Sequence, residues 1–169
     1  YSQNHVLFGY SNDAYGYWKH NYEVNIQLDE WNYFAMVKDY EMLKLYINGL
    51  AVDSVSVPQS INYYTNHNIG GRENSNSIHG NLDNISIWNK PFTQEEIQTN
   101  MDTVLTNDEE GLVGYYKFNS GTGTTLYDHS GNGNHGTIYG AEWVSNTDFE
   151  SLTISPISLD FGEVRLGES

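Results

Sequence analysis

The sequence predicts an all-β fold, an antiparallel β-sandwich with one short helix. Tyrosine, which favours strands, occurs 14 times in 169 residues. Sixteen glycines and many asparagines indicate frequent tight turns. Apolar and polar side chains alternate over several short segments, as in strands that direct one face into a core. The length fits one domain, or one domain and the start of another.

Alternation and turn residues locate the predicted strands. The strand 31–37 is apolar on both faces, so we expect it to lie in the centre of a sheet. Asn48-Gly49 predicts a two-residue hairpin, because a type I′ turn needs positive φ at both positions. The full set of predicted strands is 5–10, 15–20, 22–28, 31–37, 43–47, 50–57, 82–88, 111–119 and 137–144.

The predicted helix spans residues 93–101. Thr93 and Glu96 have the spacing of a capping box, in which the threonine side chain accepts from the Glu96 amide and the glutamate reaches back. The composition changes after residue 147. We therefore predict one domain at 1–147, and a linker with the first strand of a second, truncated domain at 148–169.

Several motifs occur in the order and spacing of one known family. They are Trp31-Asn-Tyr-Phe-Ala-Met-Val37, Leu45-Tyr-Ile-Asn-Gly49, Ile69-Gly-Gly71, Gly80-Asn-Leu-Asp-Asn-Ile-Ser-Ile-Trp-Asn89 and Phe92-Thr-Gln-Glu-Glu-Ile97. With these motifs, residues 5–144 resemble laminin G-like domains of the concanavalin A-like lectin/glucanase superfamily. The resemblance implies a concanavalin A-like β-sandwich, the jelly roll, acting as a binding module.

Two segments depart from a simple laminin G-like pattern. Residues 111–119 and 127–136 resemble the opening hairpin of that family, yet they follow the helix. We interpret them as completing the sandwich from the C-terminal side, so 112–118 should pack with 82–88. Ile157-Ser-Leu-Asp-Phe-Gly-Glu-Val164 resembles the first strand of immunoglobulin-like repeats of the abnormal-spindle/hydin type.

Charge and composition exclude several partners. The chain has 22 acidic and 7 basic residues, a net charge of −15, which would repel a phosphate backbone and so argues against nucleic acid. No apolar run is long enough for membrane insertion. Both ends look like cuts, so we expect covalently linked neighbouring domains in a larger protein. Its expected location is extracellular, secreted or at the cell surface.

Catalysis is not expected. The predicted strands lack the paired carboxylates that glycoside cleavage needs. Asp39 and Glu41 alternate but fall in a turn, and the chain has no cysteine nucleophile. A concave face is expected to carry Phe34, Met36, Tyr46 and Asn48 instead, which could stack and form hydrogen bonds.

A cation site is predicted from oxygen-bearing side chains. Asp83 shares parity with Ile85 and Ile87, so its carboxylate should point inward and need compensation. The loop 128–134 offers a carboxylate, amides and free carbonyls, which suit either calcium or an Asx-turn loop that caps backbone amides. The resemblance implies a structural calcium in this region. The predicted ligands are Asp83, Asn119, Asp128, Asn132 and Asn134.

The predicted ligand-binding residues are aromatic side chains among Asn and Asp, which can stack on sugar rings. They are Tyr15, Tyr17, Trp18, Tyr63 and Tyr64. The expected function is a non-catalytic adhesion or recognition module for carbohydrate or an extracellular matrix or surface glycoprotein. The alternatives are a purely structural spacer and an ancillary domain of a secreted hydrolase.

Overall fold

The computed structural model describes residues 5–8, 20–23, 26, 29–58, 68–71, 78–145, 150–154 and 159–160. The chain divides into two compact units. Unit 1 comprises Tyr1–Tyr63 and Pro91–Val104, and unit 2 comprises Tyr64–Lys90 and Leu105–Ser169. The described elements are strands in antiparallel sheets and one short helix, which confirms the predicted all-β class.

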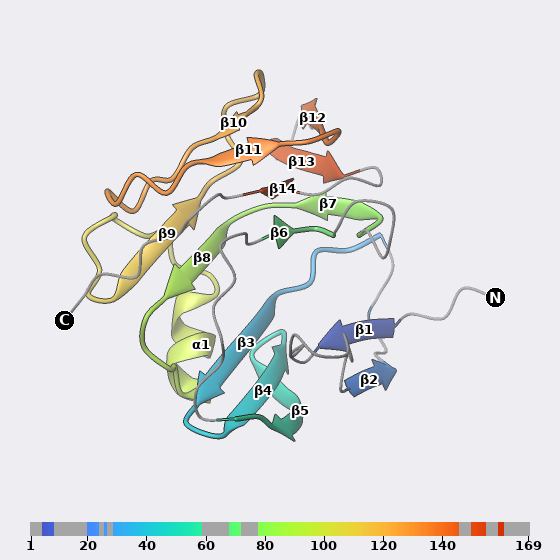
Figure 1. Ribbon diagram of the computed structural model, residues 1–169, viewed down its shortest axis with the longest axis vertical. Coiled ribbons are helices and arrows are strands. Elements are labelled where there is room, and N and C mark those ends of the chain that lie inside the picture. Colours follow the sequence, from blue (N-terminus) through green and yellow to red (C-terminus); the bar gives the residue numbers. More distant parts are fainter. Residues whose placement is uncertain are drawn as a thin grey trace. The chain divides into compact units, whose positions relative to one another are not determined.

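Unit 1 contains a strand pair, a three-stranded sheet and the helix (Figure 1). Strand β1 (His5–Phe8) pairs with β2 (His20–Glu23). The sheet has the order β3 (Phe34–Asp39), β4 (Met42–Ile47), β5 (Leu50–Ser56). Strand β4 therefore occupies the centre of this sheet. The prediction that the segment 31–37 forms the central strand is wrong, because β3 begins three residues later and pairs only with β4 among the described strands.

The predicted hairpin at Asn48-Gly49 is confirmed. Ile47 pairs with Leu50, and the two turn residues have φ of 50° and 75°. The Asn48 side-chain oxygen also accepts a hydrogen bond from the Tyr33 amide at 2.8 Å. This bond ties the turn to the residue that precedes β3.

Helix α1 (Gln94–Asn100) begins as predicted, with both halves of the capping box formed by Thr93 and Glu96. Its side chains hold it on the β4–β5 turn: Gln98 donates to the Gly49 carbonyl, and Gln94 accepts from the Ala51 amide. Ile97 is buried against the sheet.

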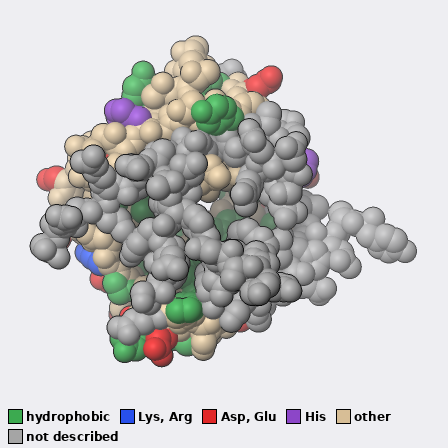
Figure 2. Space-filling view, viewed as in Figure 1, with side chains coloured by type: hydrophobic (Ala, Val, Ile, Leu, Met, Phe, Trp, Pro, Cys, Tyr) green, Lys and Arg blue, Asp and Glu red, His purple; other side chains and the backbone are tan. Residues whose placement is uncertain are grey.

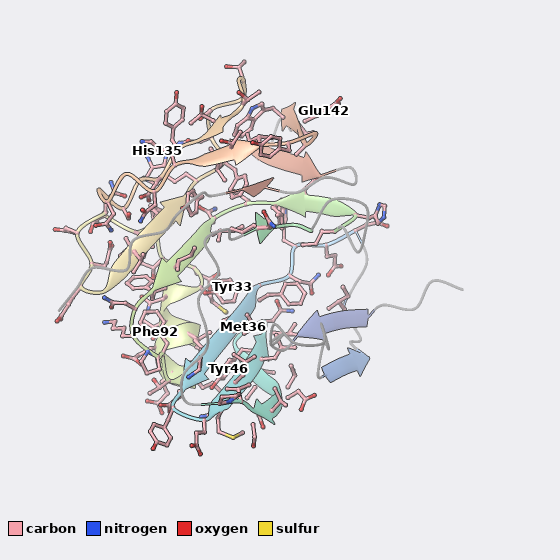
Figure 3. All side chains as sticks on the ribbon, in the orientation of Figure 1. Tyr33, Met36, Tyr46, Phe92, His135 and Glu142 are labelled. Carbon is pink, nitrogen blue, oxygen red and sulfur yellow. The ribbon has the colours of Figure 1, made fainter. Side chains whose placement is uncertain are left out.

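The concave face predicted in unit 1 is only partly correct. Phe34 and Met36 are exposed and lie on the face that they share with their partners in β4, Ile47 and Leu45. Tyr46 pairs with Ala35 and lies on the opposite face, buried with Ile97 and Phe92 (Figure 3). Tyr46 is therefore a core residue that stabilises the helix–sheet contact and offers nothing to a ligand.

Unit 2 contains three sheets (Figure 1). One has the order β10 (Thr125–Leu126), β11 (Gly136–Ile138), β14 (Leu159–Asp160), β6 (Asn68–Ile69). A second has the order β12 (Glu142–Ser145), β13 (Glu150–Ile154), β7 (Gly80–Leu82). The third pairs β8 (Ile85–Trp88) with β9 (Leu112–Tyr116).

The pairing of β9 with β8 is the contact that the sequence predicted between 112–118 and 82–88. Ile85 pairs with Tyr116 and Ile87 with Gly114. Tyr116, Phe118 and Leu126 are almost fully buried and form the core of unit 2 with Ile138. The segment after the helix thus contributes strands and core side chains to the same unit as β8.

Two predicted single strands are each two strands in the structure. The segment 82–88 is interrupted at Asp83-Asn84, where Asn84 adopts φ of 50°, so β7 and β8 enter different sheets. The segment 137–144 is interrupted at Gly140, with φ of 66°, between β11 and β12. Both predictions were wrong because a single residue with positive φ, in the left-handed region of backbone conformations, ends a strand.

Strands β13 and β14 come from the tail that the sequence analysis assigned to a second domain. Leu152 pairs with Leu82 in β7, and Leu159 pairs with Ile69 in β6. These pairings were not predicted, and they place two strands of the tail in the sheets of unit 2. The boundary near residue 147 stays a prediction.

Candidate functional site

The aromatic residues predicted to bind a ligand, Tyr15, Tyr17, Trp18, Tyr63 and Tyr64, lie outside the described residues. A different aromatic surface lies within them, on the ladder that joins β10 to β11. Thr125 pairs with Thr137, and Leu126 pairs with Gly136. Because side chains alternate across a strand, one face of this ladder is buried and the other faces outward.

Two exposed tyrosines adjoin this ladder, Tyr127 directly after β10 and Tyr139 directly after β11. Tyr127 and Tyr139 are each 49% exposed, while Leu126 and Ile138, on the other face, are buried in the core. His135 and Thr137 are also exposed. We name these alternate residues, Thr125 and Thr137 on the ladder with Tyr127, His135 and Tyr139 directly beside it, the tyrosine strip.

Tyr127 and His135 contact each other within the tyrosine strip. Their rings meet edge to face, with centroids 5.5 Å apart. The His135 Nδ1 accepts a hydrogen bond from the Asp128 amide at 3.0 Å. This bond requires an unprotonated Nδ1, so the neutral ring carries its proton on Nε2. His135, which directly precedes β11 (Figure 3), is therefore held from two sides.

The loop 128–134 folds against the edge of β9 that is not paired with β8. The buried Asp128 carboxylate accepts hydrogen bonds through Oδ1 from the amides of Tyr115, at 2.9 Å, and Ser130, at 2.8 Å. Through Oδ2 it accepts from the Ser130 hydroxyl and the Asn134 amide, both at 2.9 Å. Burial raises the pKa of Asp128, but these hydrogen bonds outweigh it and hold the pKa below its ordinary value.

The asparagines of this loop act as donors to β9. Asn132 donates through Nδ2 to the carbonyls of Leu112 and Val113, and Asn134 donates through Nδ2 to Val113. The Asn134 carbonyl in turn accepts from the Tyr116 hydroxyl at 2.6 Å. The backbone-capping alternative of the sequence analysis describes these contacts well.

Within the described part of the chain, the other two predicted ligands do not bond to the loop, and Asp83 is linked to it only through Asn84, which accepts from the Tyr115 hydroxyl at 3.4 Å. Asp83 accepts from the Asn84 amide at 2.8 Å and from the Asn84 side chain at 3.1 Å, and burial raises its pKa. Asn119 is exposed. Among the described residues, no hydrogen bond joins Asp83 or Asn119 to Asp128.

These residues do not fit a calcium ion at the loop. Calcium takes about six to eight oxygen ligands, and a carboxylate has about four lone-pair positions to offer. The four donors around Asp128 already occupy those positions. Within the described ranges, no group of three or more His, Cys, Asp or Glu side chains could hold a metal.

A hydrolytic site is equally unsupported by the described carboxylates. Asp39 is the last residue of β3, Glu41 lies in the following turn, and both are exposed. The tyrosine strip contains no carboxylate. In the part of the chain that the structure describes, no helix has the length and apolar character needed to span a membrane.

The sequence analysis missed the tyrosine strip. It treated 137–144 as one strand and did not recognise that 125–126 pairs with it. The available signal was an alternation in the sequence. His135, Thr137 and Tyr139 alternate with Gly136 and Ile138. Leu126-Tyr127, earlier in the chain, continues the same pattern of an apolar residue followed by an aromatic one. The two short strands were too brief to be recognised as a ladder without their partner.

Comparison with known proteins identifies the family. A laminin G family model, described as the concanavalin A-like lectin/glucanases superfamily, matches residues 1–98. No curated protein and no solved structure matches the chain. The immunoglobulin-like resemblance of the tail has no matching family model and stays a prediction. The family match covers more than half of the sequence, so the chain belongs to the concanavalin A-like lectin/glucanase superfamily.

Proposed function

We propose that this chain is a non-catalytic carbohydrate-binding module that binds neutral polysaccharides through the tyrosine strip. The observation that carries the proposal is the pair of half-exposed tyrosines, Tyr127 and Tyr139, that directly follow the paired strands β10 and β11. Membership in a lectin-containing superfamily supports a binding role. The proposal includes a secreted or cell-surface location, where polysaccharides are accessible.

The chemistry of the tyrosine strip suits sugar rings. Aromatic faces stack on the apolar C–H faces of sugars, and the phenol hydroxyls remain free to bond at the wet edge. His135 and Thr137 add polar groups between the two tyrosines. The four residue steps from His135 through β11 to Tyr139 correspond to about 13 Å at the usual rise of a strand. That span suits a chain of sugar rings better than a single ring.

The strip is held rigidly, which favours binding. The neighbouring residues Leu126 and Ile138 are buried in the core, which fixes the backbone from which the two tyrosines extend. The His135 ring is fixed by Tyr127 and by the Asp128 amide. A preorganised surface loses little conformational entropy when a ligand binds.

Charge selects neutral over acidic polysaccharides. The net charge of −15 disfavours sulfated or uronic acid chains. Figure 2 shows acidic side chains scattered over the described part of the visible surface. The strip itself supplies no carboxylate that could serve as the acid or base in glycoside cleavage, so binding without turnover is expected.

The experiment is affinity electrophoresis of the 169-residue chain in gels that contain neutral polysaccharides, such as xylan, mannan or mixed-linkage glucan, with heparin and alginate as acidic counterparts. We expect retardation by at least one neutral polymer and none by the acidic ones. Tyr127→Ala and Tyr139→Ala should each weaken retardation, and the double variant should abolish it. Tyr40→Ala is the matched control, because Tyr40 is 63% exposed and lies outside the strip.

Three results would contradict the proposal. Retardation that survives the double variant would place the site elsewhere. Reducing-sugar release that a single Asp or Glu substitution abolishes would identify an enzyme. Absence of retardation by every polymer would favour the structural spacer. Because single-site affinities of such surfaces are low, the assay is repeated with a tandem fusion that adds avidity.

A further inference from the structure

We infer that the loop Asp128–Asn134 is a metal-independent clamp that takes the place of a neighbouring strand on the free edge of β9. The inference concerns residues for which the family resemblance implies calcium, and it does not depend on the proposed sugar binding. It rests on where the backbone groups of β9 find their hydrogen-bond partners.

One edge of β9 is paired with β8, in the register Ile85 to Tyr116 and Ile87 to Gly114. The other edge presents backbone groups of Leu112, Val113 and Tyr115. A strand edge buried without partners is costly, because each backbone group there loses its hydrogen bonds to water and gains none in return. The loop is the segment that bonds to this second edge.

At Tyr115 the loop most clearly takes the place of a neighbouring strand. Its amide donates to Asp128 Oδ1 at 2.9 Å, and its carbonyl accepts from the His129 amide at 2.7 Å. Tyr116 and Asp128 also form an isolated antiparallel bridge. At this point the loop provides one backbone bond and one side-chain bond, where a paired strand would provide two backbone bonds.

Further along β9, side chains of the loop donate hydrogen bonds to the backbone carbonyls of the strand edge. The Val113 carbonyl accepts from the side-chain amides of Asn132 and Asn134 at 3.1 and 2.9 Å. The Leu112 carbonyl accepts from Asn132 at 3.0 Å. Residues Ser130, Asn132 and Asn134 alternate, and the positive φ of Gly131 and Gly133, 86° and 74°, turns the chain between them.

The same contacts explain why the loop needs no cation. The negative charge of Asp128 is compensated by four donors, three of which are backbone amides. A cation would have to displace bonds that also close the edge of β9. An edge completed in this way is unavailable for pairing with another chain, which protects the module from edge-to-edge association.

The first test compares thermal unfolding of the 169-residue chain in excess EDTA and in millimolar calcium. We expect the same midpoint in both. A midpoint that rises with calcium in the wild-type chain, and no longer does so in Asp128→Asn, would overturn the clamp and establish the cation site.

The second test uses two matched substitutions of predicted ligands, Asp128→Asn and Asp83→Asn, both measured in EDTA. The clamp requires that Asp128→Asn lowers the midpoint by several degrees, while Asp83→Asn, whose carboxylate bonds only to Asn84 in the described contacts, changes it little. A calcium site predicts that neither substitution has an effect in EDTA and that both have one in calcium.

The third readout is amide hydrogen exchange at Tyr115. Asp128→Asn should accelerate exchange of the Tyr115 amide by about tenfold or more relative to amides that bond to β8. If Asp128→Asn does not fold, Ser130→Ala removes a single hydroxyl and should loosen the same edge to a smaller extent. Unchanged protection of Tyr115 in a folded variant would contradict the clamp.

Discussion

The carboxylate of Asp128 accepts a hydrogen bond from the backbone amide of Tyr115, 13 residues earlier in the chain, at 2.9 Å. Three further donors surround the same carboxylate. The bond links a polar loop to the fully buried strand β9. The ionised state of one side chain therefore contributes to the stability of unit 2, with consequences for its dependence on pH.

Stability should fall in acid, and Asp128 should account for part of the loss. Hydrogen bonding holds the pKa of the folded Asp128 below its ordinary value despite burial. A depressed carboxyl pKa stabilises the folded state fully above the ordinary value of about 4, and this contribution is lost as the pH falls toward the folded pKa. Urea unfolding at a series of acidic pH values measures how steeply the free energy of unfolding falls with pH, which we call the acidic slope.

Asp128→Asn should make that acidic slope shallower. Asp83 provides a control with the opposite sign, because burial raises its pKa and its charged form destabilises the folded state at neutral pH. Asp83→Asn should therefore steepen the acidic loss. Identical slopes in all three proteins would contradict the assignment of these shifts.

Thr93→Ala should destabilise the chain by about 1 kcal/mol, the usual value of a lost N-cap. The Thr93 side chain accepts from the Glu96 amide, and Glu96 bonds back to the Thr93 amide. Thr99→Ala is the matched control, because the Thr99 hydroxyl donates to the Glu95 carbonyl within the helix and alanine has the higher helix propensity. Chemical unfolding, monitored by circular dichroism, should show a lower free energy of unfolding for Thr93→Ala and no decrease for Thr99→Ala.

Gly49→Ala should cost more than Gly121→Ala. Both glycines have positive φ, 75° and 67°, so each substitution incurs backbone strain of about 1–2 kcal/mol. A Cβ at Gly49 would also lie 2.8 Å from Cγ of Gln98, whereas a Cβ at Gly121 meets nothing within 4 Å. The difference between the two unfolding free energies measures how tightly α1 packs on the β4–β5 turn, and equal losses would mean that the helix yields.

Local signals predicted the elements that depend on neighbouring residues. The Asn48-Gly49 turn and the Thr93–Glu96 capping box each need only a few consecutive residues, and both formed as expected. The pairing of β8 with β9, which 23 residues separate, followed from the interpretation that residues 111–119 complete the sandwich from the C-terminal side.

Features that depend on backbone conformation or on distant partners were predicted less accurately. Asn84 and Gly140 end strands through positive φ, which parity arguments do not register. For the same reason Asp83 was placed on a strand face that does not exist at that position. The loop 128–134 was recognised as oxygen-rich, but composition cannot tell whether its amides bind a cation or the backbone of β9. That distinction depends on a partner that lies more than a dozen residues away.

Tyr116→Phe should test how closely the clamp and the core depend on each other. Tyr116 is fully buried, and its hydroxyl donates to the Asn134 carbonyl at 2.6 Å. Removing the hydroxyl leaves that carbonyl without this donor, so the unfolding free energy should fall by about 1–2 kcal/mol. Tyr127→Phe removes a half-exposed hydroxyl and should change it by less than about 0.5 kcal/mol.

Tyr116→Phe should also change how the stability of the chain depends on pH in alkaline solution. Burial and the negative charge of Asp128 both raise the pKa of Tyr116, so its folded form resists ionisation. A raised phenol pKa contributes stability that is complete below the ordinary value of about 10 and is lost as the pH rises toward the folded pKa. Wild-type stability should therefore decline above that pH more steeply than the stability of Tyr116→Phe, whereas Tyr127→Phe should follow the wild type. If Tyr116→Phe instead declines in parallel with the wild type, the Tyr116 hydroxyl is accessible to water in the folded chain, and the loop does not close over the end of β9.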